Sequence, residues 1–127
     1  MQRQVLLSIK PNFAEAIFNG TKRFEFRRTI FRNPSVTKVV LYASSPVRKV
    51  LGEFTVEDVL DMSIKELWAE TNEWSGIDRD YFNNYFRGRD SGYALKIKKP
   101  RRFSKPLNLK KDFGINFPPQ SFCYLEK

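Results

Sequence analysis

The apolar residues of this chain occur in short segments separated by turn residues, and this spacing limits the possible fold more than any other feature. Many of these segments alternate apolar and polar residues or are rich in β-branched residues, which is typical of strands of roughly four to eight residues. Asn33-Pro34-Ser35 and Ser44-Ser45-Pro46 mark two of the turns. The pattern predicts strands at Gln4–Ile9, Lys22–Arg28, Lys38–Ala43, Val50–Val56 and Tyr93–Lys98, and a final strand in the tail Phe117–Leu125.

Short helices are predicted between these strands. Pro11 can open the first helix, and Asn19-Gly20 offers the left-handed residue with which many helices end. Ser63-Ile-Lys-Glu66 has the pattern of a capping box, so a second helix should begin there, and Asp78 can cap a third. The 127 residues suit one domain with one core. We therefore expect residues 1–127 to form a single α+β domain, a barrel-like sheet flanked by short helices.

The residue types that are missing exclude several kinds of chemistry. The chain has no His and one Cys, Cys123, so it cannot hold a Ser-His-Asp or Cys-His catalytic site or a zinc site with His ligands. No acidic cluster has the spacing of a metal site, and we expect no metal and no cofactor. No apolar run approaches the roughly 20 residues of a transmembrane helix, and no signal peptide is evident. The expected location is the cytoplasm, without membrane contact.

Charge is distributed unevenly along the chain. The formal net charge is +9, but residues 1–52 carry +8, residues 53–80 carry −7 and residues 81–127 carry +8. This pattern suggests one basic face and one acidic face after folding. A basic face attracts phosphate polyanions. The acidic residues 53–80 could bind a protein partner. For the basic face and for the acidic segment alike, the simpler alternative is a solvated surface without a partner.

The segment Gly20–Arg27 holds the most informative charged residues. Strand alternation places Glu25 and Arg27 on one face, and Lys22 lies near the start of the strand. Together they could bind a base edge and a phosphate, because Arg forks fit phosphate and carboxylates accept from exocyclic amines. The alternative is a salt-bridged outer strand face with no ligand.

Gly20, Lys22, Glu25 and Arg27 have the spacing G-x-K-x-x-E-x-R, which resembles the signature of the ASCH (activating signal cointegrator homology) family of the PUA-like superfamily. The resemblance extends over essentially the whole chain. It includes Leu7–Pro11 before a short helix, Tyr42-Ala-Ser44 at a strand end and Pro118–Phe122 in the tail. It implies a small PUA-like β-barrel with a cleft near Lys22, Glu25 and Arg27. The family is generally regarded as RNA-binding, with links to translation and transcription control, so RNA or a modified nucleoside is the expected ligand.

This sequence also resembles some small bacterial members of the family that are amidohydrolases and remove an acyl group from acetylated cytidine. Their site uses a Lys, a Thr at the position of Glu25 here, and a Glu from the following helical region. This sequence keeps Lys22 and offers Glu70 or Glu73, but it lacks the Thr. We therefore expect a binding module. The alternative is an amidohydrolase or nuclease at the same cleft, with Lys22, Glu25 and Glu73 as its catalytic residues.

Further ligand contacts are expected around this cleft and along a second basic segment. Strand-end and loop side chains could read or stack on bases, although core packing is an equal alternative for Tyr42. The densest basic run could be a phosphate track or a solvated strand edge. The expected cleft residues, besides Lys22, Glu25 and Arg27, are Lys10, Tyr42, Ser44, Gln120 and Ser121, and the expected track is Lys96, Lys98, Lys99, Arg101 and Arg102.

Overall fold

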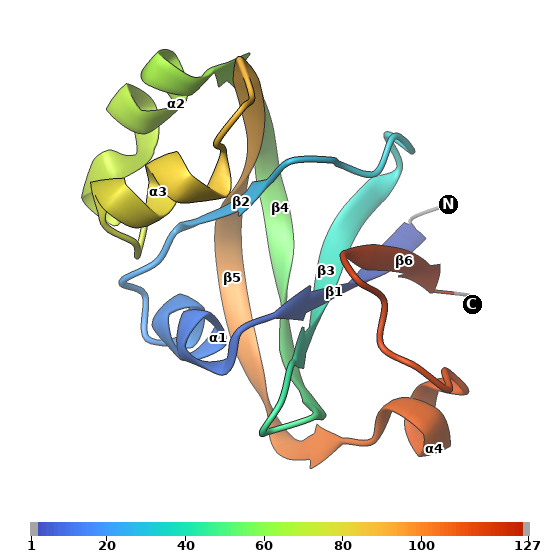
Figure 1. Cartoon of the computed structure of the whole chain (residues 1–127). Helices are drawn as coiled ribbons and strands as arrows, with labels where there is room; N and C mark the ends of the chain where they lie inside the picture. Colours follow the sequence, from blue (N-terminus) through green and yellow to red (C-terminus); the bar gives the residue numbers. More distant parts are fainter. Residues whose placement is uncertain (1–2, 126–127) are drawn as a thin grey trace.

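The fold is a single sheet with short helices beside it (Figure 1). The structure, a computed structural model, describes residues 3–125. The strands are β1 (Arg3–Ile9), β2 (Phe24–Arg27), β3 (Val36–Ala43), β4 (Lys49–Ser63), β5 (Ser91–Leu107) and β6 (Phe122–Leu125). The helices are α1 (Pro11–Phe18), α2 (Ile64–Thr71), the 3-10 turn η1 (Asn72–Trp74), α3 (Arg79–Tyr85) and α4 (Leu109–Phe113).

The six strands form one sheet in the order β2-β5-β4-β3-β1-β6. β1 and β3 are parallel, whereas the other neighbours are antiparallel. This mixed sheet with short helices confirms the expected α+β class. The expected barrel is not closed, because β2 and β6 stand at the two edges of the sheet and do not pair with each other.

The centre of the sheet is buried on both faces. Along β1, Val5 and Leu7 pack into one apolar cluster, while Leu6 between them packs into another. β3 alternates in the same way between Val39 and Val40. Strand side chains point to opposite faces in turn, so the continuous apolar runs of these two strands are explained by burial on both sides.

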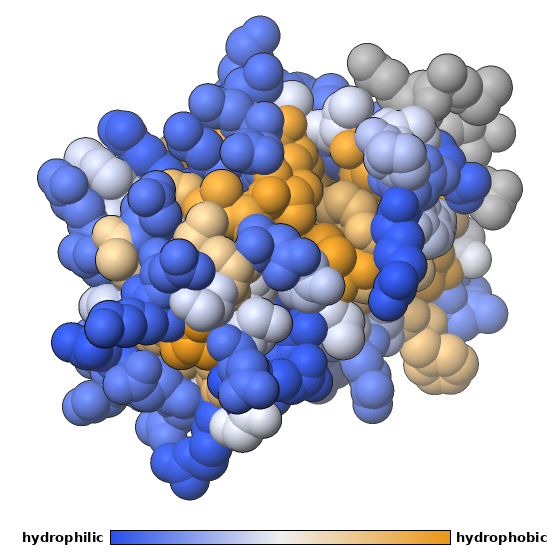
Figure 2. Space-filling model, turned by 90° about the horizontal axis from the view of Figure 1, so that it is seen from above, coloured by the Kyte–Doolittle hydropathy of each residue, from blue (hydrophilic) through white to orange (hydrophobic). Residues whose placement is uncertain are grey.

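A third apolar cluster joins α2 and α3 to β2 and β5. Phe26 of β2 packs edge-on against Phe82 of α3, with ring centroids 5.3 Å apart. The predicted caps position these helices: Glu66 N donates to Ser63 Oγ at the start of α2, and Tyr81 N donates to Asp78 at the start of α3. Figure 2 shows this end of the molecule from above, with hydrophobic side chains gathered in the centre of a mostly hydrophilic face.

Two strands are longer than the sequence predicted. β4 continues to Ser63 and β5 to Leu107, and the two pair along most of their length. β5 passes through Pro100 at a register shift, where Arg101 pairs with Glu53 and Lys98 with Thr55. A bulge of this kind leaves a proline outside the hydrogen-bonded ladder. The short helix α4 was not predicted. No helix in the described part of the chain is both long and apolar enough to span a bilayer.

Candidate functional site

The signature side chains in β2 and just before it are buried together. Lys22, Glu25 and Arg27 are 2%, 5% and 8% exposed. Arg27 Nη1 lies 3.2 Å from Glu25 Oε2, and Lys22 Nζ lies 3.9 Å from Glu25 Oε1. The predicted convergence of the three residues is present in the structure, but not as a solvated outer face. Buried charges require partners, and here one carboxylate faces two cations.

Lys22 occupies a largely apolar environment. Its ammonium donates to the Ser75 carbonyl oxygen at 2.7 Å and lies 5.0 Å and 5.1 Å from the ring centroids of Phe13 and Phe26. Burial lowers the pKa of Lys22, and the charge of Glu25 opposes this effect. Desolvation disfavours the charged amine, so this ammonium is a better proton donor than a surface lysine.

Gly76 allows the lysine stem to lie under the loop that follows η1. A Cβ on Gly76 would lie 2.6 Å from Lys22 Cβ and Cγ, and the residue has φ +71°. Gly88 has a similar φ of +80°, but a Cβ there would meet nothing within 4 Å. A comparison of substitutions at Gly76 and Gly88 therefore separates the effect of backbone conformation from the effect of close packing.

We expect Gly76→Ala to destabilise the protein more than Gly88→Ala. Both substitutions force a non-glycine residue into the left-handed region, at roughly 1–2 kcal/mol. Gly76→Ala also overpacks the Lys22 stem, which adds roughly 1–3 kcal/mol. Urea unfolding of the two variants measures the difference. Equal losses of stability would show that Lys22 is not held by this loop.

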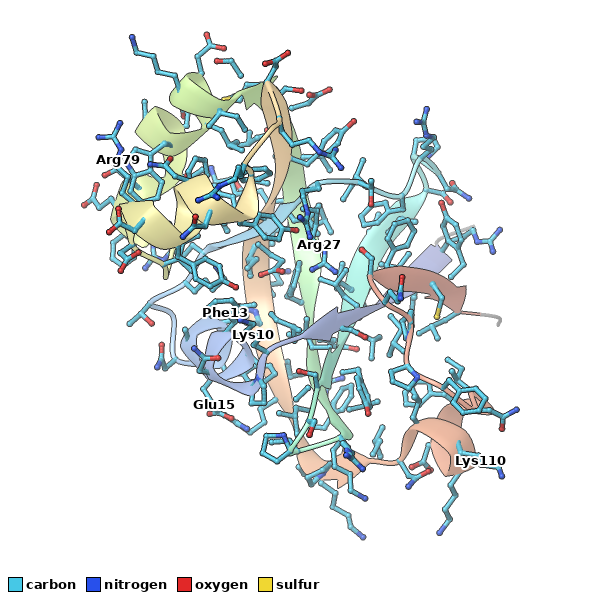
Figure 3. The ribbon with its side chains drawn as sticks, in the orientation of Figure 1. Lys10, Phe13, Glu15, Arg27, Arg79 and Lys110 are labelled. Atoms are coloured by element: carbon cyan, nitrogen blue, oxygen red, sulfur yellow. The ribbon has the colours of Figure 1, made fainter. Side chains whose placement is uncertain are left out.

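Arg27 connects β2, at one edge of the sheet, to β1 and to the residue directly before β6. Its Nη2 donates to the carbonyl oxygen and the hydroxyl of Ser121, at 3.0 Å and 3.2 Å, and to the Ser8 carbonyl oxygen at 3.4 Å. Figure 3 shows Arg27 extending from β2 toward β1 and β6. The side chain thus bridges strands that do not pair through their backbones. Within residues 3–125, Arg27 Nε is the buried side-chain polar atom without a hydrogen-bond partner.

A cavity of about 140 Å³ opens above these charges. It is smaller than the roughly 300–1,000 Å³ of pockets for drug-sized ligands, so it suits one planar ring better than a whole nucleotide. Tyr81 and Tyr85 of α3 form one wall, and burial raises the pKa of Tyr85. The lining consists of Ser8, Ile9, Lys10, Phe13, Lys22, Glu25, Phe26, Arg27, Ile77, Tyr81 and Tyr85.

The other expected cleft residues have different positions. Lys10 lines the cavity. Ser121 does not line it, but accepts a hydrogen bond from the lining residue Arg27. Tyr42 is buried in the core cluster around Leu6 and does not line the cavity. Ser44 donates its N–H to the Ile9 carbonyl oxygen at 2.9 Å, and Gln120 is exposed. Neither residue lines the cavity.

Seven lining residues were not predicted as cleft residues: Ser8, Ile9, Phe13, Phe26, Ile77, Tyr81 and Tyr85. Tyr81, Phe82, Tyr85 and Phe86 have helical spacing in the sequence, a pattern that predicts core packing for all four. The structure places Phe82 and Phe86 in the core and leaves the two tyrosines at the cavity. The signal was present in the sequence, because a tyrosine keeps its hydroxyl group near polar surroundings whereas a phenylalanine does not need to.

Glu70 and Glu73 line a different depression, a groove of about 600 Å³ beside the cavity. Lys22 lines both, since its stem passes between them. Glu73 is exposed and does not line the cavity that holds Glu25. The structure therefore does not bring the three residues of the amidohydrolase alternative into one cavity.

Much of the expected phosphate track is paired with carboxylates. Lys96 contacts Glu57 at 3.5 Å and Arg101 contacts Glu53 at 3.0 Å, and Arg102 pairs with Glu15. In the described chain, Lys98 and Lys99 are exposed and have no ion pair. The expected division into one acidic and one basic face is wrong along β4, because its acidic residues lie beside the basic residues of β3 and β5. No group of three or more His, Cys, Asp or Glu in residues 3–125 lies close enough together to hold a metal.

Comparison with known protein families gives a match over most of the chain. The model of the ASCH domain matches residues 7–106. The chain therefore belongs to the ASCH domain family, as its G-x-K-x-x-E-x-R segment suggested.

Individual relatives extend the comparison. An ASCH domain-containing ribonuclease from Zymomonas mobilis is 30% identical over 129 residues, which cover 99% of this chain and 86% of the relative. The large ribosomal subunit protein uL22 of Ureaplasma parvum is 30% identical over 96% of this chain, but the match spans 39% of that protein. The crystal structure of ASCH from Zymomonas mobilis superposes with a TM-score of 0.89, at 29% identity, and covers 98% of this chain and 88% of that one.

Proposed function

We propose that this protein binds single-stranded RNA and that the cavity above β2 receives one base. The observation that carries the proposal is the burial of Lys22, Glu25 and Arg27 together at an open cavity with aromatic walls. Unstacked bases of single-stranded RNA are commonly stacked on aromatic rings and hydrogen-bonded along their edges. Glu25 can accept from an exocyclic amine, and Lys22 and Arg27 can donate to ring or carbonyl acceptors.

Two further observations support RNA as the ligand. The net charge of +9 favours a polyanion, and the Zymomonas relative carries the name ribonuclease. Two expectations stay predictions: a role in translation or transcription control, and a protein partner for the acidic residues 53–80.

The affinity of the protein for single-stranded RNA should fall as salt rises. Phosphate contacts release counterions, so the logarithm of the affinity should decrease linearly with the logarithm of the salt concentration, by about 0.7 per contact in a single strand. Filter binding of short oligonucleotides between low and physiological salt measures the slope. An affinity that does not depend on salt, or no binding even at low salt, would contradict the proposal.

Cleavage of RNA at the same cavity is the second candidate function. The name of the Zymomonas relative favours it, and so does the lowered pKa of Lys22. In the cleavage of RNA by its own 2′-hydroxyl, a base takes the hydroxyl proton and an acid protonates the leaving 5′-oxygen. Glu25 is the acceptor at the cavity and Lys22 is the donor, and such proton transfers typically contribute 10²–10⁴-fold in rate.

Incubation with end-labelled RNA, followed by gel electrophoresis, tests for cleavage. If cleavage occurs at this site, the products carry a 2′,3′-cyclic phosphate and disappear with Lys22→Met. A parallel incubation with acetylated cytidine tests the amidohydrolase alternative. We expect no turnover of that nucleoside, because a carboxylate stands where the similar enzymes have a hydroxyl nucleophile.

A further inference from the structure

Two exposed basic side chains lie against the aromatic wall of the cavity. Lys10 Nζ is 5.2 Å from the ring centroid of Tyr81, and Arg28 Cζ is 4.7 Å from that of Tyr85. Neither cation has an ion pair within residues 3–125. A cation over an aromatic face is held there by roughly 0.5–1 kcal/mol at an exposed site, so both charges are positioned but not neutralised.

The two cations stand at opposite ends of the same wall. Tyr81 and Tyr85 are four residues apart on α3, and such residues share one helix face, about 6 Å apart along the axis. Lys10 precedes α1, whereas Arg28 follows the last residue of β2. Figure 3 shows Lys10 beside Phe13 at the start of α1, and Arg27, the neighbour of Arg28, at the far end of β2.

Both cations suit phosphate. An Arg fork binds phosphate through two parallel hydrogen bonds, and a Lys ammonium binds it as a point charge. The cavity between them is too small for a base together with its sugar and phosphate groups, as its volume of about 140 Å³ indicates. The phosphates of a ligand whose base enters the cavity therefore remain outside it, in reach of Lys10, which lines the cavity, and of Arg28, which lies over the ring of the lining residue Tyr85.

We propose that the site binds an internal nucleotide of an RNA strand, with the base in the cavity and its two flanking phosphates on Lys10 and Arg28. This inference rests on the proposed function and narrows its ligand. A free nucleoside would leave both cations without a partner, and the nucleotide at a strand end would leave one. An internal nucleotide is the ligand that engages both.

Titrations with four small ligands test this inference: a nucleoside, its 5′-monophosphate, its 3′-monophosphate and its 3′,5′-bisphosphate. The four common RNA nucleosides are compared first, and the base of the one that binds most tightly is used in all four ligands. Each ligand is titrated at low salt, and binding is followed by NMR chemical shifts. Each phosphate should tighten binding at least roughly tenfold, since a hydrogen bond to a charged group contributes about 1.5–3 kcal/mol and about 1.4 kcal/mol is tenfold. The bisphosphate should therefore bind at least roughly 100-fold more tightly than the nucleoside.

Variants then assign each phosphate to its side chain. Lys10→Ala should remove the advantage of one monophosphate and Arg28→Ala that of the other. Lys110→Ala, on α4, is the control and should change nothing. The inference is overturned if both variants weaken all four ligands equally, or if neither variant affects the bisphosphate.

The same titrations separate this inference from the proposed function. If the nucleoside and RNA bind but the bisphosphate binds no better than the nucleoside, the base site stands and the phosphate assignment is wrong. If no RNA and none of the four ligands binds, the proposed function itself is wrong.

Discussion

Glu25→Ala is expected to lower the free energy of unfolding by about 3–5 kcal/mol, because removing one member of a buried ion group leaves uncompensated charge in the interior. Glu25 is 5% exposed and is the carboxylate that Lys22 and Arg27 both approach. Domains of this size typically have 5–15 kcal/mol of stability in total, so the loss would leave the fold marginal. Urea unfolding monitored by circular dichroism measures it.

Glu57→Ala is the matched control for this prediction. Glu57 also pairs with a lysine, Lys96, but both side chains are about 45% exposed. Pairs at the surface contribute less than about 1 kcal/mol. If Glu25→Ala and Glu57→Ala cost the same, the buried charge cluster does not have the energetic importance that its geometry indicates.

Glu25→Gln separates stability from recognition. It keeps the shape of the side chain and an oxygen that can accept from Arg27, but it removes a negative charge near a polyanion. Pure electrostatics then predicts tighter binding of every RNA. A side chain that reads a base predicts weaker or less selective binding despite the more favourable charge. Tighter binding of all sequences with unchanged selectivity would reduce Glu25 to a structural role.

Arg27→Ala is expected to have the second large effect, on stability and on RNA affinity together. The substitution removes the hydrogen bonds to Ser121 and Ser8 that join the sheet edges, and it leaves Glu25 with Lys22 alone, at 3.9 Å. Breaking such a buried pair costs about 3–5 kcal/mol. Loss of a bidentate contact to a base costs about 1–3 kcal/mol of binding energy. Unfolding measurements and filter binding at one salt concentration test the two effects separately.

Arg101→Ala and Arg27→Lys are the controls for this prediction. The side chain of Arg101 is 64% exposed, so its loss should leave stability within about 1 kcal/mol and only lower the salt slope of RNA binding. Arg27→Lys keeps the charge but loses the planar fork, so it should recover part of the stability and little of the selectivity. An Arg101→Ala variant that loses as much affinity as Arg27→Ala would place the RNA on the outer strand surface instead.

The sequence allowed prediction of the common face of Glu25 and Arg27, because strand alternation follows from local spacing alone. It did not show that this face is buried. That burial depends on residues far away in the chain, since α3 covers the cavity and Ser121 near the C-terminus accepts from Arg27. Local patterns determine which residues share a face, whereas tertiary contacts decide which face is covered.

The prediction of where β5 ends was wrong for a similar reason. Pro100 normally ends a strand, so the predicted strand stopped at Lys98. In the structure β5 continues because its long partner β4 tolerates a register shift at that point. The hydroxyl groups of Tyr81 and Tyr85 were a local signal against full core packing, but the cavity that they line forms only through the position of α3 beside β2. Such pairings between distant segments are not contained in local sequence.

The most direct test of the central claim is the NMR signal of the Arg27 Nε–H group during titration with single-stranded RNA. This donor is buried and has no protein partner among the described residues, so a ligand acceptor in the cavity should shift its resonance. Comparison with Arg27→Lys identifies the signal. We predict that it shifts in step with binding, together with signals of Lys22 and Tyr85. RNA binding that shifts Arg101 and Arg102 and leaves the Arg27 signal unmoved would contradict the account.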